Sequence, residues 1–201
     1  MVKSETLGHI DEQAAQRREY LTLSFSPSSG PLRSRWRNNG LSADFLGDYV
    51  KTFLPANEDG SEKWRAEILH AVTYVANEFL ENAMKYHDGD IDVPIGIRLE
   101  LTADRIIVHA SNGINAEQAQ RYKSFIEYLN IHDAAELLIR QLEESSANPD
   151  AKFSCLGLVT MVSDYGVKLG WRFDVSANNP RITTVTTSAV LPFTNDSGEI
   201  A

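Results

Sequence analysis

The stretch Asn77–Tyr86, which reads NEFLENAMKY, carries most of what this 201-residue sequence indicates about its fold. It forms the last part of a long predicted helix, whose apolar stripe consists of Trp64, Ile68, Val72, Val75, Phe79 and Ala83. Asp59 or Ser61 can cap this helix at its start, and the helix is predicted to end near Tyr86. The stretch therefore lies on an amphipathic helix, with polar residues beside the apolar stripe.

Three of these polar residues form a stripe of their own. At 100° per residue, Glu78, Asn82 and Lys85 lie within about 60° of one another. An amide oxygen can ligate Mg²⁺, a carboxylate four residues earlier can orient or deprotonate a hydroxyl group, and an ammonium group can meet phosphate oxygens. On spacing alone, the commoner explanation is a row of boundary residues, with Glu81 and Lys85 as an ion pair.

Strands and further helices are predicted on both sides of the long helix. Alternating apolar residues predict strands near 21–25, 95–101, 105–110, 167–175 and 182–191, and helical spacing predicts helices that begin near 42, 115, 133 and 156. Strand pairs joined by hairpins predict the α+β class: a two-layer sandwich with helices on one face of a mixed, largely antiparallel sheet. Residues 20–193 form the single predicted domain, between an N-terminal arm (1–19) and a C-terminal tail (194–201).

Composition and charge narrow the class of protein. The chain is 42% hydrophobic and 23% charged, as in ordinary globular proteins. Its formal net charge of −9 repels phosphate backbones, which argues against general nucleic-acid binding. A single cysteine, Cys155, excludes an intramolecular disulfide, and no apolar run has the length of a membrane span. We therefore expect a cytoplasmic protein that binds neither nucleic acid nor membrane.

The run at 77–86 resembles the N-box of the GHKL superfamily, which includes histidine kinases, anti-sigma-factor serine kinases and gyrase. The family's helix carries Glu, then Asn four residues later, and then Ala and a basic or aromatic residue. The resemblance implies a histidine-kinase-like ATPase fold that binds ATP and Mg²⁺. It would make Asn82 the Mg²⁺ ligand, Glu78 the catalytic base and Lys85 a phosphate contact.

The two glycine boxes of the family are present in altered form. The Asp-x-Gly-x-Gly box corresponds to Ser111, Asn112 and Gly113, where Ser111 replaces the aspartate that selects adenine and the second glycine is missing. The Gly-x-Gly-Leu-Gly-Leu box corresponds to residues 153–158, where Leu156, Gly157 and Leu158 remain but Phe153 and Cys155 replace the first two glycines. The resemblance assigns nucleotide binding to Ser111, Asn112, Gly113, Leu156 and Gly157. For Gly157, close helix packing is an equally good explanation.

Residues 115–152 lie between these boxes and correspond to the ATP lid of the family. They are predicted to be helical, and such an insert could close on nucleotide, pack permanently or dock a partner.

Two hypotheses remain open. In the first, the chain is an ATP-binding serine/threonine kinase of bacterial partner-switching signalling that acts on a small protein resembling anti-sigma-factor antagonists. In the second, it is a nucleotide-free, non-catalytic protein-binding module on the same fold. A homodimer is compatible with either hypothesis.

Overall fold

The computed structural model describes residues 3–11, 19–26, 36–54, 61–102, 104–147 and 156–192. The helices are α1 (Trp36–Lys51), α2 (Ser61–Tyr86), α3 (Ala116–Ile131), α4 (Ala134–Ala147) and α5 (Leu156–Tyr165). The strands are β1 (Lys3–Gly8), β2 (Glu19–Phe25), β3 (Ile95–Leu101), β4 (Arg105–Asn115), β5 (Lys168–Val175) and β6 (Ile182–Pro192). None of the described helices is both long and apolar enough to cross a membrane.

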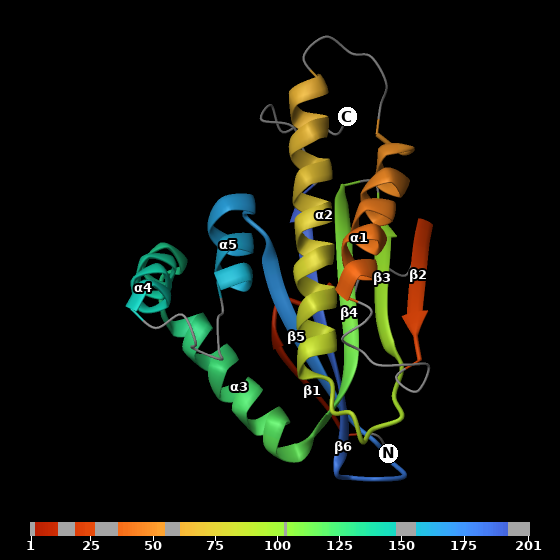
Figure 1. Ribbon diagram of the computed structural model, residues 1–201, viewed down its shortest axis with the longest axis vertical. Helices are drawn as coiled ribbons and strands as arrows, with labels where there is room; N and C mark the ends of the chain where they lie inside the picture. The colour runs from red at the N-terminus through yellow and green to blue at the C-terminus, as the bar shows by residue number, and fades with distance from the viewer. Residues whose placement is uncertain are drawn as a thin grey trace.

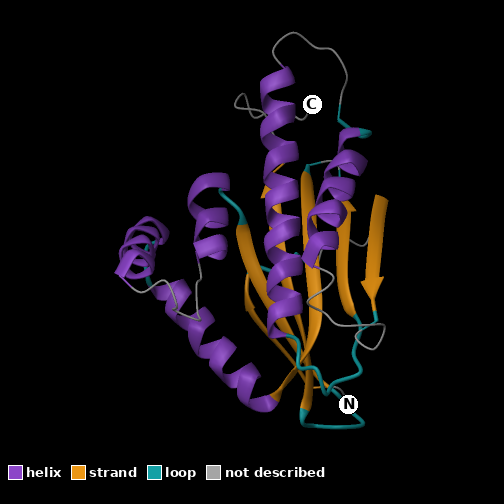
Figure 2. Cartoon of the chain, in the orientation of Figure 1, coloured by secondary structure: helices purple, strands orange, loops and turns teal. Residues whose placement is uncertain are grey.

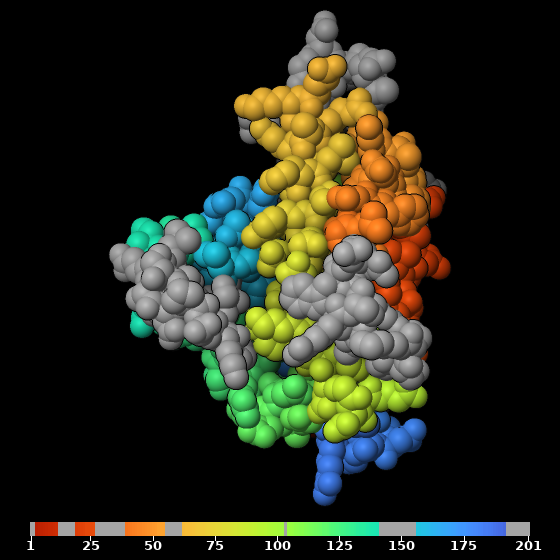
Figure 3. Space-filling model, in the orientation of Figure 1, coloured from red at the N-terminus to blue at the C-terminus, as the bar shows by residue number. Residues whose placement is uncertain are grey.

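The described strands form one six-stranded sheet in the order β1-β5-β6-β4-β3-β2. Each pair of neighbours in this sheet is antiparallel. Helices α1, α2 and α5 cover one face of the sheet (Figures 1 and 2). In the space-filling view, α2 separates α1 from α5 along this face (Figure 3). The predicted α+β class, a two-layer sandwich with helices on one face, is confirmed.

The core lies between α2 and the middle of the sheet. The predicted apolar stripe of α2 is buried there from Val72 onward, with Val72 and Val75 fully buried and Phe79 1% exposed, while Trp64 and Ile68 are partly buried. Strand side chains alternate between the two faces, so that every second residue of β3 and β4 meets the helices. The buried residues on this side include Ile95, Ile97, Leu99, Ile106, Val108 and Ala110.

An N-terminal arm is predicted over residues 1–19, and the structure differs from this prediction at residues 3–8. Those residues form β1, an edge strand whose register runs from Lys3 opposite Val175 to Gly8 opposite Gly170. Five of the six residues are exposed, and only Leu7 is partly buried. This strand is held mainly by its backbone ladder to β5, so it lacks the apolar alternation by which sequence reveals a strand.

Two other element boundaries differ from expectation. Helix α1 begins at Trp36, six residues before the predicted start, and its first turn carries no acidic residue to mark it. Strand β4 continues through Asn115, whereas the sequence placed its end near Ala110. Residues 111–113 are therefore part of the central sheet and alternate between its two faces.

The described part of the insert is helical over Ala116–Ile131 and Ala134–Ala147. Asn115 caps α3 through a reciprocal capping box with Gln118, and the Asp133 carboxylate accepts from the backbone N–H of Ala135 and Glu136 at the start of α4. Helix α3 leads from the end of β4 to α4, which packs on α5 (Figure 1). Residues 148–152 of the insert, Asp59, Phe153, Cys155 and the tail at 194–201 lie outside the described residues.

Candidate functional site

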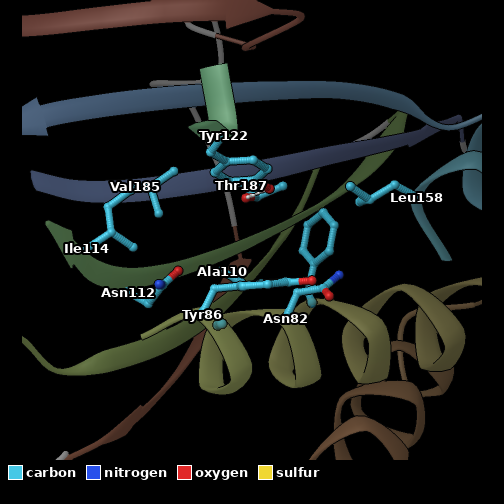
Figure 4. Close-up of a pocket in the computed structure, with 11 residues that line it drawn as sticks. Asn82, Tyr86, Ala110, Asn112, Ile114, Tyr122, Leu158, Val185 and Thr187 are labelled. Atoms are coloured by element: carbon cyan, nitrogen blue, oxygen red, sulfur yellow. Dashed lines mark hydrogen bonds between the residues drawn. The ribbon is translucent and has the colours of Figure 1, made fainter. Parts of the chain in front are cut away.

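A small pocket lies between α2, β4, β6 and α3 (Figure 4). It is lined by Phe79, Asn82, Ala83, Tyr86, Ala110, Asn112, Ile114, Tyr122, Leu158, Val185 and Thr187. Its walls are mostly apolar, and the polar groups reach it from α2, from the two central strands and from α3. The open space inside is about 20 Å³, which is room for one water molecule.

The three predicted residues of the polar stripe on α2 have different surroundings. Asn82 borders the pocket. Glu78 lies one turn earlier and faces the start of α5, where it packs against Gly157. Lys85 is exposed, with its Nζ 5.2 Å from the centroid of the Tyr86 ring. Asn82 is thus the member of the trio that a ligand in the pocket would meet first.

Glu78 is a carboxyl group with an unusual environment. Burial raises its pKa above the ordinary value of 4.5, the neighbouring Glu81 carboxylate raises it further, and the Lys85 ammonium group opposes both effects. Glu78 therefore holds its proton to a higher pH than an ordinary glutamate does. Proton transfer is most effective when the pKa of the catalytic group approaches the working pH, so this shift suits a general base.

Gly157 and Leu156 begin α5 beside this carboxyl group. A Cβ at position 157 would overlap the carboxylate of Glu78, so the glycine is required by the packing of α5 on α2. Leu156 is partly buried, and Leu158 lines the pocket. The helix-packing explanation for Gly157 therefore holds in the structure, and the same contact places Glu78 at a helix N-terminus.

Of the three residues predicted from the second box, Asn112 alone reaches the pocket. It is 6% exposed, and its Nδ2 is a buried donor without a hydrogen-bond partner among the described residues. Ser111 faces the opposite side of the sheet, across from Gly96 on β3. Gly113 lies beneath Ile91, whose Cγ2 would be 2.7 Å from an added Cβ.

Gly113 also takes part in a hydrogen-bonded connection between β4 and the end of α2. Its N–H donates to Nδ1 of His87 at 3.3 Å, and Nε2 of His87 lies 3.1 Å from the carbonyl oxygen of Ile91. His87 is therefore a neutral imidazole with its proton on Nε2, and burial lowers its pKa. This connection fixes the position of β4, and hence of Asn112, relative to α2.

Tyr122 lines the pocket, although the sequence gives it only as one apolar position of the helix predicted to begin near 115. The Tyr122 hydroxyl accepts a hydrogen bond from Nε1 of Trp171 at 2.9 Å and lies 3.3 Å from Oγ1 of Thr187. Figure 4 shows its ring entering the pocket from α3, opposite Asn82 and Tyr86 on α2. A tyrosine within an apolar helical stripe was the one available signal, because its partners are distant in sequence.

The described residues contain no group of three His, Cys, Asp or Glu side chains that could hold a metal ion. A site for Mg²⁺ at this pocket would therefore combine the Asn82 amide oxygen with oxygens from a ligand and water, as Mg²⁺ sites commonly do. The unpartnered amide of Asn112 fits a ligand with hydrogen-bonding edges.

The chain matches no protein-family model, and no curated protein matches it in sequence. Among solved structures it is similar to a chain in the crystal structure of the SiaB-SiaC complex from Pseudomonas aeruginosa, with a TM-score of 0.51 and 16% sequence identity. The similarity covers 84% of this chain and 89% of that chain. At this level of identity the likeness supports the fold.

Proposed function

We propose that this chain is a nucleotide-dependent regulator of partner-switching signalling that transfers a phosphoryl group from ATP to a small partner protein. The observation that carries the proposal is the placement of two amides, Asn82 and Asn112, on one pocket, with the Glu78 carboxyl group one helical turn from Asn82. The structural likeness to a chain from a two-protein complex supports a protein as the partner.

Each residue has a defined role in this proposal. Asn112 reads the base, because an amide offers a donor and an acceptor that match the adjacent ring nitrogen and amino group of adenine. Asn82 would ligate Mg²⁺, which would neutralise negative charge on the phosphate groups. Lys85, on the exposed side of the stripe, contacts a phosphate oxygen. Ser111 has no role in base recognition here, because it faces away from the pocket.

Glu78 acts on the hydroxyl group of the partner protein. Its carboxylate accepts the hydroxyl proton while the hydroxyl oxygen bonds to the γ-phosphorus and the bond to the bridging oxygen of ADP breaks. Its raised pKa makes the Glu78 carboxylate a stronger base than an ordinary glutamate carboxylate. The start of α5 beside it supplies backbone N–H groups for negative charge.

Calorimetric titration with ATP and ADP, with and without Mg²⁺, tests the proposal. Wild-type protein is expected to bind ATP in a Mg²⁺-dependent manner, and Asn82→Ala is expected to weaken that binding at least tenfold. Asn77→Ala is the matched control, because Asn77 lies on the same helix and donates to Glu81 outside the pocket. Absence of binding at millimolar ATP, or equal loss in both variants, contradicts a nucleotide site at Asn82.

The second candidate function is a nucleotide-free protein-binding module. It is favoured by the small volume of the pocket and by two strongly exposed apolar residues on the insert, Ile131 (78% exposed) and Ile139 (60% exposed). The double variant Ile131→Asp/Ile139→Asp should remain folded. In a pull-down it should fail to bind a partner protein that the wild type binds. Retention by both proteins would exclude these residues as the docking surface.

A further inference from the structure

We infer that the structure is a closed state of the pocket, in which the ring of Tyr122 occupies the place that a planar ligand needs, so that ligand binding and docking of α3 exclude each other. This inference deepens the proposed function, on which its nucleotide experiments rest. It assigns the insert a regulatory role: Tyr122 must leave before a base can meet Asn112.

The contacts of Tyr122 show why the closed state is stable without a ligand. The hydroxyl group is held between Trp171 and Thr187, which reach it from β5 and β6. The ring packs edge-on to Trp171 and Phe173, at centroid distances of 6.5 and 6.0 Å, and lies parallel to Phe125. The aromatic neighbours on several sides and the hydrogen-bonded hydroxyl group hold this side chain in one specific position.

The space left in the pocket shows that a ligand and Tyr122 cannot both occupy it. The remaining cavity is about 20 Å³, whereas pockets for small organic ligands commonly have about 300–1,000 Å³. The Nδ2 donor of Asn112 is buried in this closed state and has no acceptor among the described residues. A ligand that supplies an acceptor satisfies this group, which the tyrosine ring leaves unpaired.

Departure of Tyr122 loosens the docking of the insert, because Tyr122 is the α3 residue that bonds to Trp171 and Thr187 on β5 and β6. The other contacts of α3 are chiefly apolar, with Phe125 and Leu129 packed against the core. Ala119 and Ile126 are the buried residues of α3, and Lys123 forms an ion pair with Glu5 on β1 at 2.7 Å. Helix α3 continues into α4 through the cap at Asp133, and α4 packs on α5. Ligand occupancy is thereby coupled to the position of α4, which carries the exposed Ile139.

Removing the ring tests the competition directly. The apparent affinity of a ligand falls in proportion to the fraction of protein in the binding-competent state, so relief of the competition raises it. Tyr122→Ala is expected to bind Mg²⁺-ATP at least tenfold more tightly than wild type in calorimetry. Tyr128→Ala, a tyrosine of the same helix that contacts His132 and Arg140 outside the pocket, is expected to stay within twofold. If Tyr122→Ala does not fold, Tyr122→Phe keeps the ring and is expected to gain at least threefold.

Trp171 gives a second measurement, because its indole N–H bonds to Tyr122 in the closed state alone. In the background Trp36→Phe/Trp64→Phe, saturating Mg²⁺-ATP is expected to shift the emission of Trp171 in the otherwise wild-type protein. A smaller shift is expected with Tyr122→Phe, in which the hydrogen bond is already absent and only the ring contact with Trp171 is lost. Equal affinities for wild type, Tyr122→Ala and Tyr122→Phe, or an unmoved emission while ATP binds, overturn the inference.

A further experiment separates a protein that binds no nucleotide from a protein in which Tyr122 does not compete with a ligand. If no variant binds nucleotide, phenol serves as the probe, since it has the shape of the deleted ring and hydroxyl group. Phenol is expected to raise the Tm of Tyr122→Ala by several degrees and to leave wild type and Tyr128→Ala unchanged. A rise in the Tm of Tyr122→Ala would support a site in which a planar ligand other than ATP can replace the tyrosine ring. An unchanged Tm would overturn the inference.

Discussion

The carboxylate of Glu78 occupies the volume that a side chain at Gly157 would need. This relationship joins α2 to the N-terminus of α5 and fixes a carboxyl group at the point where the two helices meet. It explains why residue 157 is a glycine through the packing of the two helices, without any ligand. The candidate base lies within one turn of Asn82, a polar residue of α2 that borders the pocket.

Gly157→Ala is expected to lower the free energy of unfolding by about 1–3 kcal/mol, because the added methyl group forces Glu78 out of its position. In the background Glu78→Ala the same substitution should be neutral or stabilising, since alanine is about 1 kcal/mol better than glycine within a helix. Urea denaturation of the two single variants and the double variant measures this coupling. Gly89→Ala, with no heavy atom within 4 Å of an added Cβ, is the control. Additive effects of the two substitutions would contradict the contact.

The pH dependence of stability should report the neutral state of His87. Its pKa in the folded protein lies below the ordinary value of 6.5, so the unfolded chain binds its proton more readily. The stability from this residue is complete above pH 6.5 and is lost as the pH falls through the folded-state pKa. Protonation of Nδ1 also removes the acceptor for the Gly113 N–H.

Thermal unfolding of wild type and His87→Gln between pH 8 and pH 5 measures this contribution. We expect the wild type to be the more stable protein at pH 8 and its advantage to shrink as the pH falls below 6.5. A constant difference in Tm over the whole range would show that His87 does not titrate differently in the folded and unfolded states.

Several of these features could be predicted from sequence and others could not, for identifiable reasons. Helix α2 was predictable because its stripe from Trp64 to Ala83 repeats at helical spacing and packs against the core, fully so from Val72 onward. The continuation of β4 was missed because serine, asparagine and glycine are rare in strands, and their pairing with β6 overrides that preference. The alternation that begins at Ile106 in fact continues to residue 112. It places Asn112 on the helix-facing side of the sheet and Ser111 on the other side.

The closed pocket illustrates the part of a site that local sequence does not encode. Tyr122 bonds to Trp171, 49 residues later, and to Thr187, 65 residues later. These contacts exist because α3 folds back over β5 and β6, which the periodicity of α3 alone does not predict. Glu78 and Asn82 were found because both lie on one face of one helix, where spacing gives their relative positions.

Glu78→Gln should raise stability at neutral pH while it removes phosphoryl transfer. The folded-state pKa of Glu78 is raised above 4.5, so the stability from its protonated form is complete below pH 4.5 and is lost as the pH rises through the folded pKa. Glutamine keeps the neutral shape at every pH. Urea denaturation at pH 4 and pH 7.5 should show a gain for the variant at pH 7.5 alone. Glu67→Gln, an exposed site on α2, controls for the loss of one negative charge, and an equal gain there would contradict the role of burial.

Asn112→Leu separates the stability of the protein from the binding of a ligand. An apolar side chain of similar size removes the buried Nδ2 that has no acceptor among the described residues, so the free protein should be unchanged or more stable by about 1–3 kcal/mol. The same change removes both hydrogen-bonding groups offered to a base and should weaken Mg²⁺-ATP binding at least tenfold. Stability and affinity thus move in opposite directions, as expected for a polar group kept in a core for its ligand.

Asn39→Leu is the matched control for this variant. Asn39 is 1% exposed, both of its amide atoms are unpaired within the described structure, and it lies on α1 away from the lining of the pocket. Its replacement should stabilise the protein in urea to a similar degree and leave the calorimetric affinity for ATP unchanged. If Asn112→Leu binds ATP as Asn39→Leu does, the Asn112 amide is a packing defect like Asn39, and base recognition must be assigned elsewhere.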